Sequence, residues 1–288
     1  MNTHYDRTTE DIGNIVKLEH VNVTLPDQKL ATLFYVSGLG FTRDPYLMVE
    51  LDNMWINIGR NQMHLPTGVP QRLRGTIGLV VPDLSELKTR LEKVKPALAG
   101  TSFSFTDCGQ CVEVVCPWGN RFRCHGPSQE YGDMEIGMPY AEFEVPVSTA
   151  PRIVRFYREI IGAAGEAVRR DGAPAAAINA GDGQRIYFRE TDAAIPPYDG
   201  HHMQIYISDF SGPYRKLLDR KLITLETDAH EWRFVDIVDV DTNEPLFRVE
   251  HEVRSLRHPL YGRPLVNRNT AQSNRDYLRG QDAFRGKY

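Results

Sequence analysis

The order of hydrophobic and polar residues over the first 65 positions predicts one strand, one helix and three further strands. A strand pattern covers residues 16–25. Asp27 can then cap a helix with apolar residues at positions 30, 33 and 34 on one face, and this helix should stop at Gly38. The three strands that follow are expected near residues 42–47, 49–57 and 61–65. The stretch therefore predicts one β-α-β-β-β unit.

The same arrangement is predicted three more times along the chain. A second unit begins at Gly75, where Asp83 caps the helix and Glu86 completes a capping-box spacing. Its later strands are expected at residues 102–105, 111–116 and 121–125. The third unit covers about 138–190 and the fourth about 200–252.

Repeated segments support the interpretation as four units. Phe34-Tyr35 and Phe156-Tyr157 each end a helical pattern and lie 122 residues apart, and the same shift places residues 18–23 over 140–145. The sequence therefore predicts an α+β protein in which four β-α-β-β-β units form two domains. The expected boundaries are a flexible N-terminus at 1–14, an N-terminal paired domain at 15–127, a linker at 128–137, a C-terminal paired domain at 138–253 and a tail at 254–288.

Composition narrows the class of protein. With 288 residues, 41% hydrophobic and 25% charged residues, the chain is typical of a globular protein with ordinary cores. A net charge of −4 favours neither nucleic acid nor an anionic membrane as a partner, and no apolar run approaches the roughly 20 residues of a membrane span. The four cysteines fall within residues 108–124 and the N-terminus carries no signal pattern, so we expect a reducing cytoplasm.

Few short motifs suggest other chemistry. The sequence has no phosphate loop, nucleophile elbow or dinucleotide fingerprint, so no nucleotide cofactor is expected. Cys108 and Cys111 have the spacing of a zinc or redox pair, but their surroundings read as a hairpin turn, and zinc would need a second pair nearby.

The layout resembles the vicinal oxygen chelate superfamily and, more narrowly, the two-domain extradiol catechol dioxygenases. The resemblance covers about residues 17–252 and depends on the repeat, on His20 and Glu142 in equivalent strands, on Cys-Pro-Trp-Gly-Asn at 116–120, and on residues 200–209. It implies that each pair of units curls into an open-barrel cup with a metal at its centre. Ligands would come from the first strand of each unit and from the last strand of the second unit.

The resemblance implies a metal site in the C-terminal pair. Its positions match Glu142, His202 and Glu250, and the implied cofactor is a divalent metal, Fe(II) or Mn(II). The alternatives left open are a carboxylate paired with an arginine for Glu142, a core histidine for His202 and a strand-edge charge for Glu250.

Four further residues are implied around this site. His230 would move protons near neutral pH as the catalytic histidine, or would be an ordinary exposed strand residue. His201, Tyr206 and Trp232 are the expected substrate-binding residues, although His201 should face the opposite side of the strand from its neighbour.

One position departs from the dioxygenase pattern. Those enzymes use two histidines and one carboxylate, whereas the first ligand position here is Glu142. A set with two glutamates resembles the lyase and epimerase members more. In the N-terminal pair His20 and His64 lie at ligand positions, but the other two fall near Thr76 and Arg123, so that pair is expected to be metal-free.

Three functions follow in order of preference. The first is an extradiol-type, ring-cleaving dioxygenase or close relative acting on a small aromatic diol. The second is a glyoxalase-type, metal-dependent lyase or isomerase, and the third is a non-catalytic protein that binds a small molecule. The partner expected in each case is a small molecule, and the exposed edges of open cups favour a homo-oligomer.

Overall fold

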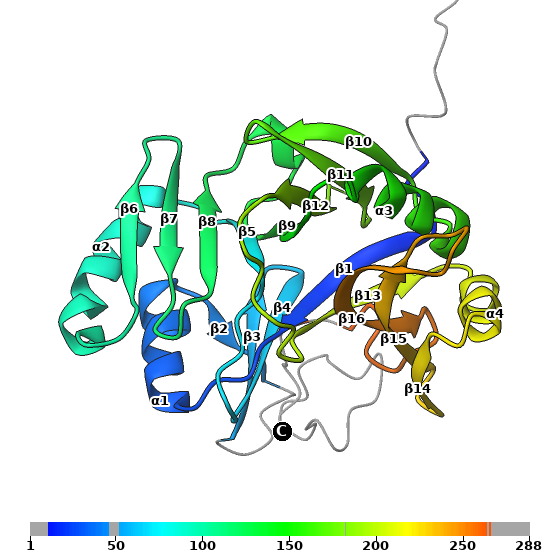
Figure 1. The fold of residues 1–288 in the computed structure, drawn as a ribbon. Coiled ribbons are helices and arrows are strands. Elements are labelled where there is room, and N and C mark those ends of the chain that lie inside the picture. Colours follow the sequence, from blue (N-terminus) through cyan, green and yellow to red (C-terminus); the bar gives the residue numbers. More distant parts are fainter. Residues whose placement is uncertain (1–10, 46–51, 182, 264, 266–288) are drawn as a thin grey trace, which may run out of the picture.

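The computed structural model describes residues 11–45, 52–181, 183–263 and 265, and it contains four β-α-β-β-β units in two eight-stranded sheets (Figure 1). The first unit consists of β1 (Ile15–Asn22), α1 (Gln28–Ala31), the π-helical η2 (Thr32–Gly38), β2 (Thr42–Arg43), β3 (Asn53–Ile58) and β4 (Asn61–Pro66). The second consists of β5 (Gly75–Val80), α2 (Leu84–Val94), the 3-10 helix η3 (Lys95–Leu98), β6 (Ser104–Asp107), β7 (Cys111–Val115) and β8 (Arg121–His125).

The C-terminal half repeats this order. After the short helix η4 (Gln129–Tyr131), the third unit consists of β9 (Gly137–Pro146), α3 (Ala150–Phe156), the π-helical η5 (Tyr157–Ile161), β10 (Gly165–Arg170), β11 (Ala173–Asn179) and β12 (Arg185–Thr191). The fourth consists of β13 (His202–Ile207), α4 (Ser211–Asp219), β14 (Ile223–Thr227), β15 (Glu231–Val238) and β16 (Pro245–Ser255). The predicted α+β architecture of four units is confirmed, and neither sheet closes into a barrel.

The predicted helix starts rest on side-chain caps. The Asp27 carboxylate accepts hydrogen bonds from the backbone N–H groups of Lys29 and Leu30 at the start of α1. Asp83 does the same for Ser85 and Glu86 at the start of α2. The first helix widens into η2 after Ala31 and ends at Gly38, as the sequence indicates.

The pairing of units differs from the expectation that consecutive units share a sheet. The first sheet has the order β14-β15-β16-β13-β1-β4-β3-β2, so it joins the first and fourth units. The second sheet has the order β10-β11-β12-β9-β5-β8-β7-β6 and joins the second and third. In Figure 1, β1 accordingly lies between β4 and β13, although 180 residues separate Asn22 from its partner His202.

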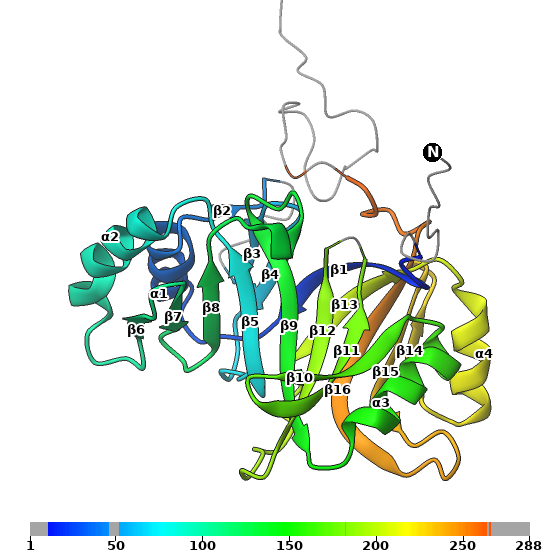
Figure 2. The same ribbon diagram turned by 90° about the horizontal axis from the view of Figure 1, so that it is seen from above.

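The physical reason for this pairing is that the first strand of every unit lies at the edge of that unit. β1 pairs antiparallel with β13, and β5 pairs antiparallel with β9. The periodicity of the sequence predicts each unit but not which first strands pair with one another, because all four first strands have similar patterns. Consecutive units remain neighbours through their helices, since α2 packs on η2 and α4 packs on η5. Figure 2 shows α1 and α2 at one end of the molecule and α3 and α4 at the other.

Each sheet has an apolar face and a polar face because side chains alternate along strands. In the first sheet Val21, Met63, Met203 and Ile205 are fully buried on the apolar face. The opposite face carries polar residues that include the histidines described below. No helix in the described part of the chain is long and apolar enough to span a membrane.

Candidate metal centre

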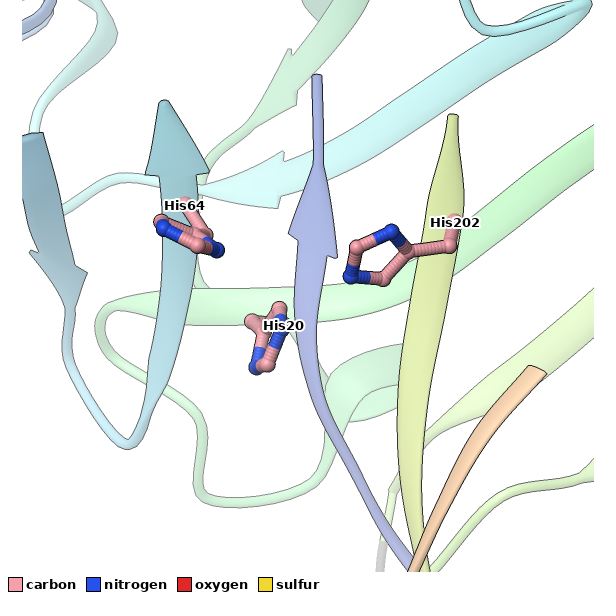
Figure 3. A group of neighbouring side chains, drawn as sticks. All are labelled: His20, His64 and His202. Atoms are coloured by element: carbon pink, nitrogen blue, oxygen red, sulfur yellow. The ribbon is translucent and has the colours of Figure 1, made fainter. Parts of the chain in front are cut away.

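Three histidines from adjacent strands of the first sheet converge on one point (Figure 3). His20 lies on β1, His64 on β4 and His202 on β13, and one ring nitrogen of each lies within 4.8 Å of the others. Strand register explains the convergence. Asn22 of β1 is directly opposite both His64 and His202, and His20 is two residues earlier on the same face.

A β-bulge on β1 gives His20 a carboxylate partner. The register between β1 and β13 shifts between Leu18 and His20, which leaves Glu19 as the extra residue. Adjacent residues of a regular strand point to opposite faces, but here Glu19 Oε2 lies 2.7 Å from His20 Nδ1. Burial opposes ionisation of Glu19, but the hydrogen bond with His20 and the electrostatic effects of His20, Lys17 and Arg254 together outweigh it and lower the pKa of Glu19 to about 2. The carboxylate therefore orients the imidazole and fixes its tautomer.

In two of the three rings, one nitrogen takes part in a hydrogen bond and the other nitrogen keeps a free lone pair. With Nδ1 of His20 donating to Glu19, its Nε2 is unprotonated. His64 Nε2 lies 2.7 Å from Asn53 Oδ1, so Nδ1 is the free nitrogen of that ring. Burial, followed by the proximity of His20 and His202, lowers the pKa of His64 to about 2. Neutral imidazoles are the form that binds metal ions.

These residues fit a divalent metal ion. His20 Nε2 and His202 Nε2 are both buried, and neither has a hydrogen-bond partner among the described residues. Buried polar atoms without partners are costly, and a metal ion would satisfy both. Metal–nitrogen bonds of about 2.1 Å place ligand nitrogens about 3.0–3.4 Å apart. Small rotations of the three rings would bring their nitrogens from within 4.8 Å to that spacing.

Glu252 is the carboxylate of the closing strand that faces the histidines. It is 2% exposed, and its Oε2 lies 3.3 Å from His202 Nε2, although without hydrogen-bond geometry. Glu252 also acts electrostatically on His20 and His64. Glu250, two residues earlier on β16, is more exposed and lies 3.5 Å from the other ring nitrogen of His202.

Two arginines hold the carboxylate of Glu252 in place. Arg233 Nη2 lies 2.7 Å and Arg254 Nη2 lies 2.5 Å from the two oxygens of Glu252. The same arginines bind Glu231, and Arg233 also binds Glu250. Three carboxylates and two guanidiniums therefore form one network with an excess negative charge beside the histidines. Such an excess favours a bound cation.

An aromatic wall and a chain segment enclose the site. The Trp55 ring stacks on His64 at 3.9 Å and meets His20 edge-on at 4.9 Å. After β16 the chain turns back over the polar face, where Tyr261 packs on Tyr206 at 4.9 Å. The Arg263 guanidinium then forms a buried ion pair of 2.7 Å with Asp44.

Comparisons with known proteins identify the fold. No family model and no curated protein sequence matches the chain. A Bacillus subtilis protein provisionally assigned as a dioxygenase superimposes with a TM-score of 0.58 at 14% identity, over 91% of this chain and 89% of that one. Glyoxalase I from Zea mays superimposes with a TM-score of 0.57 at 12% identity, over 82% of this chain and 91% of that one. Both have the vicinal oxygen chelate fold. This chain has the vicinal oxygen chelate fold as well.

Within that fold, Glu142 and His202 belong to different cups. Glu142 lies on β9 in the second sheet and forms ion pairs with Arg170 and Arg189, the latter at 3.1 Å. The structure therefore does not unite Glu142 with His202 and Glu250. The alternative of a carboxylate paired with arginine describes Glu142.

The other predicted residues are placed as follows. His230 lies exposed in the turn before β15 with φ +64°, outside the group of three histidines. Trp232 packs on Phe210, which precedes α4, and donates a hydrogen bond to the carbonyl of that residue. His201 binds Asp199 at 2.6 Å and stacks on Phe143 of the second sheet. Tyr206 is on the histidine face of β13, beneath Tyr261.

Sequence reasoning missed His20, His64, Glu19 and Glu252 as parts of one site. The sequence places His20 and His64 at ligand positions of the first unit, but pairing of consecutive units predicts their partners at Thr76 and Arg123 of the second. Pairing the first unit with the fourth replaces those two residues by His202 and Glu252. The sequence therefore contains the ligand residues, but it does not show that the first unit pairs with the fourth.

Proposed function

We propose that the protein is a metal-dependent enzyme, an extradiol-type dioxygenase or a close relative that acts on a small aromatic diol. One observation carries the proposal, namely that His20 and His202 converge beside the carboxylate of Glu252. Two histidines and one carboxylate are typical of non-haem Fe(II) oxygenases. Glu142 was the residue that opposed this function, and it lies in the other sheet.

The proposed chemistry assigns a role to each group. A bound Fe(II) or Mn(II) ion would supply Lewis acidity and open positions for the two oxygens of a diol. His20, His202 and Glu252 would hold the ion, with Glu19 fixing the orientation of His20. Trp55 forms an aromatic wall that suits a flat substrate, and the segment around Tyr261 limits access of water to that face.

His64 gives specific support to a second candidate, a glyoxalase-type lyase or isomerase. It lies on the last strand of the first unit and completes a four-residue set with His20, His202 and Glu252. A fourth protein ligand leaves fewer open positions, which suits polarisation of a carbonyl more than joint binding of a diol and oxygen.

Metal content and oxygen consumption test the proposal. The protein is purified anaerobically without chelators, and elemental mass spectrometry then measures bound metal. About one iron or manganese per chain, with oxygen consumed when catechol or a substituted catechol is added, would support the dioxygenase. Bound zinc, nickel or cobalt with turnover of a hemithioacetal and no oxygen uptake would support the lyase. Failure of Fe(II), Mn(II) and Zn(II) to bind would refute both, and retention of an aromatic ligand would then favour a binding protein.

Self-association and a cytoplasmic location stay predictions. Each sheet is completed by units of the same chain, so the centre is built without a second copy. Sedimentation equilibrium would measure the oligomeric state.

A further inference from the structure

A second cavity lies away from the histidines, where the two sheets meet. Its volume is about 380 Å³, and its walls come from the start of β1, the turn between β3 and β4, residues 131–136 and the two residues before β12. Cavities of about 300–1,000 Å³ are the usual size of small-molecule sites. None of the three clustered histidines lines it.

Hydrogen bonds across the sheets frame this cavity. Asn61 Nδ2 donates to the Leu18 carbonyl, and its Oδ1 accepts from the Met138 N–H group. Gln184 also binds both Leu18 and Met138 through its side-chain amide. Asn61 and Gln184 both line the cavity, so part of its wall is fixed by buried hydrogen bonds.

One side of the cavity is apolar. Val16, Tyr131, Met134 and Ile136 contribute to its lining. Tyr131 is 7% exposed and packs with Val80 and Tyr140 of the second sheet. A ligand in this cavity would therefore need an apolar or aromatic body.

Two cations lie on the other side. Lys17 and Arg60 both line the cavity, and within the described part of the chain neither forms an ion pair. Burial, opposed by Glu19 and reinforced by Arg263 and Arg60, lowers the pKa of Lys17. The carboxylate of Glu19 is already engaged with His20. Lys17 is partly buried and Arg60 is exposed, and a partly buried ammonium beside a second cation is unfavourable until an anion compensates it.

We propose that this cavity binds a small amphipathic carboxylate, whose carboxylate group pairs with Lys17 and Arg60 while its body packs on Tyr131 and Met134. The site is separate from the metal centre and requires no metal. Asp133 and Glu135 also line the cavity, and both side chains are exposed. A ligand with one negative charge is therefore favoured over a polyanion, which these two carboxylates would repel.

Isothermal titration calorimetry with benzoate, and with its neutral isostere benzamide, tests this proposal. We expect one benzoate per chain and no saturable binding of benzamide. Lys17→Met keeps the length of the side chain and removes the charge, so it should weaken benzoate binding at least tenfold. Because this variant also removes a desolvated charge, it should fold. Lys93→Met, on an exposed face of α2, is the matched control and should bind like the wild type.

The alternative results each overturn the proposal. Equal affinity of wild type and Lys17→Met for benzoate would show that the ammonium plays no part. Equal binding of benzamide would show an apolar site without anion recognition. Absence of saturable benzoate binding up to 10 mM, a concentration about tenfold above a weak millimolar affinity, would refute the site. Repetition with Zn(II)-saturated protein separates this site from the metal centre, because only binding at the centre should depend on the metal.

Discussion

Replacement of His20 by alanine should destroy the metal centre, whereas replacement of Glu142 should not. The two residues occupy equivalent first-strand positions 122 residues apart, so they form a matched pair. If consecutive units shared a sheet, Glu142 would be a metal ligand and His20 would not be needed for metal binding. The observed strand order predicts the reverse, because His20 shares a sheet with His202 and Glu142 does not.

The size of the effect follows from the ligand set. Loss of a hydrogen-bond partner behind a ligand costs about 10–100-fold in metal affinity, so loss of a direct ligand should cost more. His20 is one of three clustered nitrogen donors, and its ring is fully buried. We therefore expect His20→Ala to weaken binding of Co(II) or Zn(II) by at least about 100-fold, which is about 2.7 kcal/mol. Glu142→Ala should change the affinity by less than about twofold, within the usual error of additivity for distant sites.

Trp55 supplies the assay. Its ring lies 3.9 Å from that of His64 and 4.9 Å from that of His20, so an open-shell ion at the centre should quench its fluorescence. Titration of metal-free protein with Co(II) gives the affinity, and Trp55→Phe identifies the signal because the chain has three tryptophans. Circular dichroism establishes that each variant is folded.

Two results would refute this reasoning. Wild-type affinity in His20→Ala would exclude the cluster as the metal site. An equal loss in folded Glu142→Ala would mean that the two sheets share one centre. Glu142→Ala should instead lower thermal stability, because it removes the carboxylate that pairs with Arg170 and one of the two carboxylates that pair with Arg189.

Three further predictions concern stability and reactivity. Burial lowers the pKa of His251 to about 3, so below about pH 6.5 the unfolded chain takes up a proton that the folded chain does not. The free energy of unfolding should therefore fall by about 1.4 kcal/mol for each pH unit of acidification because of this residue. A flat urea-denaturation profile from pH 6 to 4 would contradict this expectation. Asp44→Ala should cost about 3–5 kcal/mol in urea unfolding because it breaks the buried pair with Arg263, whereas loss of the exposed pair of Lys88 and Asp107 should leave the urea midpoint nearly unchanged. Ellman's reagent should modify the exposed Cys108 first and Cys124 last, because burial raises the pKa of the Cys124 thiol to about 12. Comparable modification rates for the two cysteines would show that the β7–β8 region opens readily.

Local structure was predictable because its causes are local. Asp27 and Asp83 cap helices through their own carboxylates two and three residues ahead, and Gly38 ends the first helix as predicted. Strand existence follows from alternation, so the four units could be read from the chain. The choice of partner for each first strand depends on tertiary packing, and nothing in the alternation of β1 distinguishes β13 from β5.

The error at His230 has a different cause. Its position between two predicted strands suggested a place in the cup, but the backbone there is a turn with φ +64° at His230. A turn moves the side chain away from the regular inward and outward alternation of a strand. Similarly, the sequence predicts that Trp232 contacts substrate, yet its position in the register of β15 directs it to α4 and Phe210. Composition identifies such residues as suitable for a site, but only register decides the face.

In the second cup, which is formed by the second sheet, side chains of the protein itself bind the carboxylate of Glu142. Arg170 lies over the rings of Tyr140 and Tyr187 at 4.3 and 3.9 Å and binds Glu142 from this fixed position. A cation at that point would have to displace the guanidinium and leave it buried among aromatic rings, which costs several kcal/mol. In the first cup guanidiniums also hold the carboxylate of Glu252, but the rings beside it are imidazoles with free lone pairs, so a cation there gains nitrogen ligands. We therefore expect the two cups to differ in metal affinity because histidines line only the first, although guanidiniums bind the carboxylates of both and the backbone of both follows the same repeat.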